Sequence, residues 1–467
     1  MRIAIVGGGL SGLTAAYTLH RDHATEKVTL YEASHRLGGI VETERRDGFT
    51  LEAGADSWVT EKPWAEELAR ELGLGEQILR SNDHERRTYI ARGNSLVPLP
   101  DGMRMMVPVD LDLLRGSPLF SATALAAYEQ EPQHAERLRA HSLAGRGADA
   151  DESIAAFVRR HFGDEVTRDV AAPLLAGVFG GDVNRLSARA LLAPFVALEA
   201  AHGSLILGLQ RSQRAALPSV FSSLIGGLGA LIEALTARLP QHSLRRSTPV
   251  TALHRTASGW SVETAAGRES YDRILLALPL DPTCRLLAAL PLPAAREAAM
   301  LLPRDAASGL IVGFAYGPKT SLAIPPGFGF LVPGDSSRET SLLAATFIDQ
   351  KFSHRAPRGG TILRAFFARE AADHLSSLPN AKIVSLAQSQ LGTYLGPLPG
   401  HAQLTLVRRL PRSLPQYEVG HLARIAQFES LLQSLPGLVV TGNMLRGVGL
   451  PDMVREATQA AHALMQA

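Results

Sequence analysis

A glycine-rich turn close to the start of the chain constrains the fold more than any other feature. Residues 2–6 form an apolar run that is too short for a helix, and three glycines follow it at once. We therefore expect a buried strand that enters a tight turn. Gly7, Gly9 and Gly12 have the spacing G-x-G-x-x-G, in which the turn lets a pyrophosphate approach the backbone at the start of the next helix.

The residues after this turn complete a strand–helix–strand unit. We expect a helix over residues 13–19 and a second strand over residues 27–31. The strand ends at Glu32, twenty residues past Gly12, where a carboxylate can accept hydrogen bonds from a ribose. The sequence therefore predicts a dinucleotide site.

The segment after Glu32 favours FAD over NAD as the dinucleotide. Arg36 is placed to face the diphosphate. Gly38 and Gly39 can bring a second backbone segment against an extended flavin nucleotide.

Bulk composition narrows the function classes. The 47 basic and 45 acidic residues nearly balance, so we expect no nucleic-acid surface. A length of 467 residues predicts two or three lobes. Cys284 is the only cysteine and the histidines lack metal-ligand spacing, so we expect neither an internal disulfide nor a metal site. The apolar start leads directly into the glycine turn and no apolar stretch is long enough to span a bilayer, so we expect a cytoplasmic protein.

The character of the chain changes twice after the nucleotide unit. Strand patterns disappear between residues 103 and 209, where we expect helices, with the polar stretch 129–151 as a loop or a poorly ordered segment. Such helices could rest on a membrane surface or pack against the rest of the protein, and the sequence favours neither. Strand patterns return between residues 307 and 404 and predict an antiparallel sheet. A buried strand over residues 437–443 and a helix over residues 454–465 then belong with the first unit.

Motifs spread over the whole chain point to a family. In chain order they are GGGLSGLTAAY, Glu32 with RLGG, GADSW, AGVFGGDVNRLS, GSLI, RRLPRSLPQY and GNMLRGVGLPDMV. In this combination the chain closely resembles the oxygen-dependent porphyrinogen oxidases, which are FAD enzymes of haem synthesis within the flavin amine oxidase group. The first two motifs are shared by the whole group, whereas the last three are particular to the porphyrinogen branch.

The resemblance implies an α/β fold of three interleaved parts. A Rossmann-like FAD-binding domain would comprise residues 1–82, 214–285 and 405–467. A substrate domain with an antiparallel sheet would comprise residues 83–102 and 286–404. Residues 103–213 would form a helical lobe, which in relatives sits at the membrane.

The resemblance also implies cofactor contacts, carried over motif by motif. Val250 would bond the adenine through its backbone. The start of the last helix would face the flavin ring, where the positive helix end stabilises negative charge. The implied FAD contacts are Gly7, Gly8, Gly9, Leu10, Ser11, Gly12, Glu32, Ala33, Arg36, Gly39, Gly54, Ala55, Asp56, Ser57, Val250, Val448, Gly449 and Leu450.

Four further residues are implied to contact the substrate. The carbonyl of Gly177 would hold pyrrole N–H groups, and Leu331 and Phe352 would sandwich the macrocycle, although each is equally an ordinary core residue. Arg87, or its neighbour Arg86, would pair with a propionate. No side chain is expected to act as a catalytic acid or base, because the flavin carries the chemistry.

The reaction implied is the oxidation of protoporphyrinogen IX or coproporphyrinogen III by hydride transfer to flavin N5, with O2 as the acceptor and H2O2 as the product. An amine oxidase, a carotenoid desaturase and a non-catalytic porphyrin carrier stay open as alternatives. Residues 443–446 lack the aromatic side chain that amine oxidases use to hold an amine, which counts against the first of these. Peripheral membrane contact, hand-off of product to a ferrochelatase, and the choice between monomer and homodimer also stay open.

Overall fold

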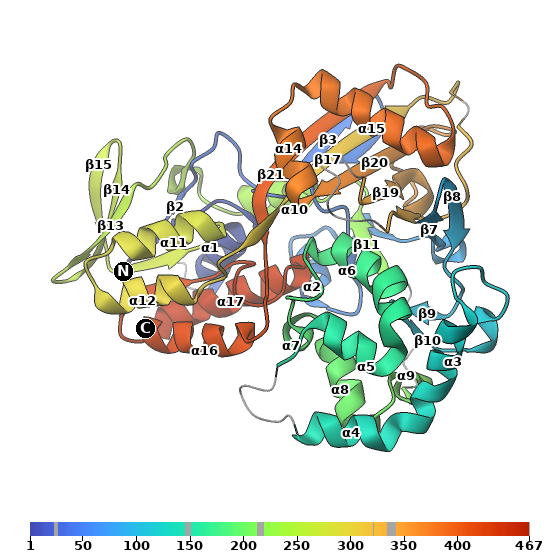
Figure 1. Ribbon diagram of the computed structural model, residues 1–467. Helices are drawn as coiled ribbons and strands as arrows, with labels where there is room; N and C mark the ends of the chain where they lie inside the picture. Colours follow the sequence, from blue (N-terminus) through green and yellow to red (C-terminus); the bar gives the residue numbers. More distant parts are fainter. Residues whose placement is uncertain (23–26, 145–150, 213–218, 321, 334–341, 467) are drawn as a thin grey trace.

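Three lobes make up the molecule. The computed structural model describes residues 1–22, 27–144, 151–212, 219–320, 322–333 and 342–466. Figure 1 shows a nucleotide lobe that holds both termini, a sheet lobe above and to its right, and a helical lobe below the sheet lobe. The three lobes agree with the α/β fold expected from the sequence.

A five-stranded parallel sheet forms the centre of the nucleotide lobe. Its strand order is β12-β2-β1-β16-β22, and every neighbouring pair is parallel. The strands are β1 (Arg2–Val6), β2 (Lys27–Tyr31), β12 (Leu244–Arg245), β16 (Arg273–Leu276) and β22 (Leu438–Val440). Because these strands come from the beginning, middle and end of the chain, the lobe is assembled from separate segments, as the sequence predicts.

Helices cover both faces of this sheet, so its central strand is buried on both sides. Ile3 and Ile5 of β1 pack into one core, whereas Ala4 and Val6 point into another. The first core is covered by α1 (Leu10–Asp22), α2 (Trp64–Glu71), α10 (Gly229–Ala237) and α17 (Leu450–Gln466). The second is covered by α11 (Leu280–Ala289), α12 (Pro293–Leu301), α16 (His421–Leu432) and the meander β13 (Ala252–Thr256), β14 (Gly259–Thr264) and β15 (Gly267–Tyr271).

A seven-stranded sheet forms the sheet lobe. Its order is β21 (Leu404–Pro415), β17 (Ala306–Tyr316), β20 (Thr361–Ala368), β19 (Ala344–Phe347), β18 (Gly329–Leu331), β7 (Thr88–Arg92) and β8 (Ser95–Pro98). Neighbouring strands are antiparallel, as expected, except that β18 runs parallel to β7. Helices α14 (Arg369–Ser376) and α15 (Asn380–Leu395) lie over this sheet (Figure 1).

The helical lobe contains the helices expected between residues 103 and 209 and one that was not expected. Its helices are α3 (Ala122–Gln130), α4 (Ala135–Ala144), α5 (Ile154–Val166), α6 (Ala172–Phe179), α7 (Ala188–Leu191), α8 (Ala193–His202) and α9 (Leu205–Arg211). Helix α4 corrects the loop predicted for residues 129–151, of which residues 145–150 lie outside the described residues. That stretch is polar, but its Ala, Glu, Arg and Leu residues are strong helix formers, and Leu138 packs inward.

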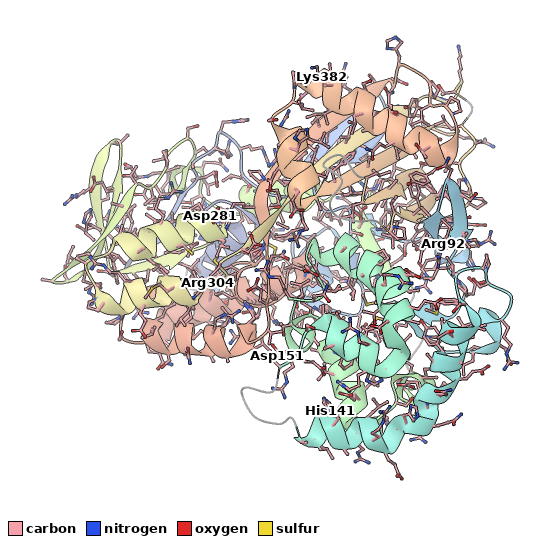
Figure 2. The ribbon with its side chains drawn as sticks, viewed as in Figure 1. Arg92, His141, Asp151, Asp281, Arg304 and Lys382 are labelled. Atoms are coloured by element: carbon pink, nitrogen blue, oxygen red, sulfur yellow. The ribbon has the colours of Figure 1, made fainter. Side chains whose placement is uncertain are left out.

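Short elements connect the lobes. They are β3 (Thr43–Arg46), β4 (Phe49–Glu52), β5 (Trp58–Val59), β6 (Ile78–Arg80), β9 (Met103–Arg104), β10 (Val107–Pro108), β11 (Phe221–Leu224) and α13 (Ile348–Lys351). Asp151 lies between the helical and nucleotide lobes (Figure 2), where its carboxylate accepts a hydrogen bond from the N–H of Gly420 at 2.8 Å. Within the described ranges, every helix is too short or too polar to cross a bilayer.

Two segments lie in different lobes from those we expected. Residues 404–415 form β21 and pair with β17, so the last nucleotide segment resumes after Pro415 and not at residue 405. Residues 280–301 form α11 and α12, which pack into a nucleotide-lobe core, so the middle segment extends past residue 285. Both shifts follow from long-range packing that leaves no local sign in the sequence.

Candidate functional site

The glycine turn connects β1 directly to α1. Gly7 has a φ of +112°, and a Cβ on Gly12 would lie 1.8 Å from the carbonyl oxygen of Gly7. A side chain at either position would therefore collide with the backbone, whereas glycine lets the helix press against the turn. The N-terminus of α1 consequently points its unpaired N–H groups toward the space beside the turn, which suits an anion.

A second backbone segment meets the turn, as Gly38 and Gly39 suggest. Gly9 and Gly38 form a parallel bridge, and the N–H of Gly38 donates to the carbonyl of Gly8 at 2.8 Å. A Cβ on Gly39 would lie 3.1 Å from the Cα of Gly9. The two glycine segments thus form a narrow, side-chain-free cradle of the kind that a dinucleotide fills.

Glu32 lies at the end of β2, beside this cradle. Its carboxylate accepts hydrogen bonds from the N–H of Gly8 at 2.8 Å and from the N–H of Ser34 at 2.7 Å. Each carboxylate oxygen keeps a lone pair that can accept a ribose hydroxyl. The N–H of Thr248 donates to the carbonyl of Glu32 at 2.8 Å, which brings Val250 to the same corner. The structure therefore gathers the residues expected at the adenosine end.

Two arginines meet at the cradle, and only one was expected. Arg36 turns back onto its own loop, where it donates to the carbonyls of Leu37 and Val41 at 3.2 Å and lies 3.0 Å from Glu42. Burial, with a further contribution from the nearby Arg408, lowers the pKa of Arg36. Arg408 extends from β21, lies 2.8 Å from Glu42 and donates to the carbonyl of Gly39 at 3.3 Å.

Arg408 belongs to the RRLPRSLPQY motif, but the motif alone does not show that this arginine reaches the first glycine segment. Arg408 places a positive charge from the sheet lobe beside the glycine cradle, and this charge favours an anionic ligand there.

The segment 54–57 continues from the cradle toward the sheet lobe. A Cβ on Gly54 would lie 1.9 Å from the carbonyl oxygen of Ile40, so the two chains are in direct backbone contact. Asp56 lies 2.9 Å from Lys351 and 2.9 Å from Arg364. Burial alone would raise the pKa of Asp56, but these two cations outweigh it and hold the pKa well below its usual range. Sequence reasoning did not find Lys351 or Arg364.

The start of α17 closes the site from the C-terminal end of the chain. Val448 and Gly449 are partly exposed and lead into Leu450, the first residue of this 17-residue helix. Lys62, just after β5, lies 2.6 Å from Asp452 in the first turn of α17. The positive end of the helix dipole therefore lies beside the segment that follows residues 54–57.

Two buried aromatic residues hold the turn before α17. His421 stacks on Tyr417 with ring centroids 4.0 Å apart, and both side chains are buried. The Tyr417 hydroxyl donates to the carbonyl of Asn443, and His421 Nε2 lies 2.7 Å from the carbonyl of Leu445. Because a carbonyl only accepts, the proton of a neutral His421 is on Nε2. The RRLPRSLPQY motif thus positions the GNMLRGVGLPDMV motif.

The residues expected to contact a substrate divide into two groups. A Cβ on Gly177 of α6 would lie 3.0 Å from Cδ2 of Leu331, so the helical and sheet lobes meet here. Arg87 lies one residue before β7, and its carbonyl accepts a hydrogen bond from Phe328 beside β18; its side chain, like that of Arg86, is exposed.

Phe352 stands apart from this group. Its ring is completely buried, with Lys351 Nζ at 5.3 Å and the guanidinium of Arg355 at 5.6 Å from its centroid. It therefore presents no surface to a ligand in this structure.

Comparison with known proteins agrees with this architecture. The family model for flavin containing amine oxidoreductases matches residues 10–465. The chain is 29% identical to a coproporphyrinogen III oxidase of Bacillus subtilis, covering 98% of this chain and 96% of that protein. It is 31% identical to the protoporphyrinogen oxidase of Bos taurus, and the match covers 98% of this chain and 97% of that protein.

A solved structure extends the agreement to three dimensions. The crystal structure of a candidate protoporphyrinogen oxidase from Exiguobacterium superposes with a TM-score of 0.86 at 33% identity, over 100% of this chain and 99% of that one. The family's flavin fits the cradle, the acidic residue at the end of β2 and the helix dipole described above. The chain belongs to the family of flavin containing amine oxidoreductases.

Proposed function

We propose that this protein oxidises a porphyrinogen to a porphyrin with FAD as the cofactor and O2 as the electron acceptor. The observation that carries the proposal is the meeting of Gly177 and Leu331, residues of two lobes that the porphyrinogen-specific resemblance assigns to one substrate. Full-length similarity to both a coproporphyrinogen III oxidase and a protoporphyrinogen oxidase supports it.

The chain supplies binding and orientation for the cofactor. The cradle of Gly7–Gly12 and Gly39 would hold the pyrophosphate, Glu32 the ribose, and the segments 54–57 and 448–450 the flavin end. FAD bound there would supply the redox chemistry, namely uptake of a hydride in each two-electron oxidation of the substrate and transfer of the electrons to O2. The positive end of α17 would stabilise negative charge at that end of the site.

The substrate contacts follow from the chemistry of a porphyrinogen. Gly177 lies in the last turn of α6, where helix geometry leaves carbonyls free to accept hydrogen bonds, and pyrrole N–H groups are donors. Leu331 offers an apolar contact to the macrocycle, and the exposed Arg87 can pair with a propionate. We assign the apolar contact to Leu331 alone, because Phe352 is buried.

The test uses the purified protein with its bound flavin and measures porphyrin fluorescence in air. Coproporphyrinogen III and protoporphyrinogen IX are compared side by side, because the first carries two propionates where the second carries two vinyl groups. We expect a rate well above spontaneous oxidation with at least one of them. Turnover of an amine or a carotene, with no porphyrin formed above the spontaneous rate, would contradict the proposal.

A matched pair of variants tests the propionate contact. Arg87→Gln should raise KM for the preferred porphyrinogen about tenfold, which corresponds to the loss of one partly exposed charge-assisted contact. Arg86→Gln removes the same charge one residue further from β7 and should leave KM unchanged. An equal effect of both variants would show that general positive charge, and not one positioned arginine, attracts the substrate.

A further inference from the structure

Five charged side chains are buried where the nucleotide lobe meets the sheet lobe. Glu52 and Asp56 come from the nucleotide lobe, and Lys351, Arg355 and Arg364 come from the sheet lobe. The side chains of Glu52 and Arg355 are fully inaccessible, and that of Arg364 is 1% exposed. Lysine side chains usually lie at the surface, but that of Lys351 is only 9% exposed. We call these five residues the interface charge network.

The interface charge network holds each part of the segment 54–57. Arg364 donates to the carbonyl of Gly54. Lys351 Nζ donates to Asp56 and, at 2.9 Å, to the hydroxyl of Ser57. Ser223 links the two halves of the network, because it donates to the carbonyl of Asp56 at 2.7 Å and accepts from Arg355. Charged groups of the network thus hold Gly54, Asp56 and Ser57 of the segment that is implied to contact the flavin.

The network is not electrically balanced. Three cations face two carboxylates, so one net positive charge is buried when all five groups are ionised. Burial raises the pKa of Glu52 and so favours its neutral form; protonation of Glu52 would increase the excess of positive charge. The guanidinium groups stay protonated, since arginine is not deprotonated in proteins. Arg45, whose charge also acts on Arg355, is paired with Glu233 at 2.7 Å and leaves the balance unchanged.

The arginines of the interface charge network also lack some of the hydrogen bonds that they could form. Within the described residues, the Nε atoms of Arg355 and Arg364 are buried and have no hydrogen-bond partner. An uncompensated buried charge is costly, and in a protein that only needed to join two lobes an apolar contact would serve as well. The excess of positive charge therefore points to an anionic partner at this interface.

We infer that the interface charge network supplies a fixed positive charge that stabilises the reduced, negatively charged flavin and so raises its reduction potential. The inference rests on the proposed function, because it places the flavin of FAD beside the segment 54–57. Charge acts over several ångströms in a site of low polarity, and charge near the ring tunes the electronics of a flavin. Lys351 is then an electrostatic positioning residue and takes no part in proton transfer.

Two substitutions of opposite sign test this inference. Lys351→Met removes a positive charge and should shift the oxidised-to-reduced flavin equilibrium about tenfold toward the oxidised form, about 30 mV lower for a two-electron couple. Asp56→Asn removes a negative charge and should shift it by a similar factor the other way. The measurement is anaerobic equilibration of the purified, flavin-bound protein with a redox dye, without porphyrinogen.

The controls separate electrostatics from structure. Ser223→Ala removes a neutral hydrogen-bonding link between Arg355 and the carbonyl of Asp56 and should leave the potential unchanged, and Lys351→Arg should restore it. Shifts of the same sign in Lys351→Met and Asp56→Asn, or no shift in either, would overturn the inference. If either variant loses its flavin, Glu52→Gln and Arg355→Met form a second pair with opposite expected signs. Loss of flavin in every charge-changing variant would also overturn it and would assign the network to flavin binding alone.

The test is independent of substrate. A protein that carries FAD but fails to oxidise a porphyrinogen would refute the proposed function and leave the expected shifts in potential unchanged. A protein with the proposed activity but without opposite shifts would refute only the role of the network.

Discussion

His421 provides the sharpest quantitative prediction, because its environment forbids a charge. Burial lowers its pKa to about 4; the hydrogen bond to the Leu445 carbonyl opposes this, and the positive charges of Arg424 and Arg446 add to it. Within the described residues its Nδ1 is buried without a hydrogen-bond partner, so a second proton would enter an unpaired position.

The sign of the effect follows from proton binding in the two states. Below a pH of about 6.5 the unfolded chain protonates this histidine, whereas the folded chain does not until the pH approaches about 4. The folded state is therefore stabilised least in acid. The difference of about 2.5 pKa units corresponds to a loss of about 3 kcal/mol once the pH lies below both values, and to about 2 kcal/mol at pH about 5.

The assay is urea unfolding at neutral pH and at pH about 5, for the wild type and for His421→Gln. Glutamine can keep the donor to Leu445 but does not titrate. We expect the wild type to lose about 2 kcal/mol more on acidification than His421→Gln. His141→Gln is the control, since His141 is exposed on α4 at the edge of the helical lobe (Figure 2) and should leave the wild-type loss unchanged. An equal loss in the wild type and in His421→Gln would refute the reasoning.

Three further substitutions test other parts of the structure. Gly12→Ala should yield a protein without bound flavin, because its Cβ would overlap the Gly7 carbonyl; Gly400→Ala, with open space around it, should keep the flavin absorption. Glu199→Gln should cost roughly 2 kcal/mol in thermal or urea unfolding, because it removes the buried carboxylate that Arg160 and His161 share, while Arg160 keeps its ion pair with Glu152. Leu331→Ala should raise KM for the porphyrinogen several-fold, through loss of apolar contact, with an unchanged flavin spectrum; an unchanged KM would remove Leu331 from the substrate site.

The parts predicted well from sequence are those with local signals. The strand at residues 27–31 was predicted with its observed bounds, because it precedes the acidic residue that closes the strand–helix–strand unit. The interleaved fold was implied by the family resemblance, because its motifs run in order over the whole chain.

The parts that were missed depend on contacts between distant residues. Lys351 and Asp56 are 295 positions apart, and Arg364 and Asp56 are 308 apart, so no window of sequence contains the pair. A lysine, such as Lys351 at the end of the short helix α13, is normally expected at the surface. Helix α4 was missed for a different reason: its polarity suggested a loop, although one inward Leu138 is enough to anchor it.

The orientation of side chains could also not be predicted from the sequence. Arg36 lies in the expected loop, but its guanidinium turns toward the carbonyls of Leu37 and Val41, and Arg408 from another lobe approaches Gly39. The resemblance implied a substrate contact for Phe352, but the structure buries its ring beside two cations. Motifs locate such residues along the chain, and only packing decides which way they face.

One anaerobic experiment tests the central claim most directly, namely that three segments of the chain hold one flavin beside a porphyrinogen. The purified, flavin-bound protein is mixed with a porphyrinogen without oxygen, and flavin absorption and porphyrin fluorescence are followed together. With the protein in at least threefold molar excess, we predict reduction of three flavins for each porphyrin formed, because this oxidation removes six electrons and each flavin accepts two; the oxidised flavin absorption should recover when air is admitted. Flavin absorption that the porphyrinogen leaves unchanged would contradict the account.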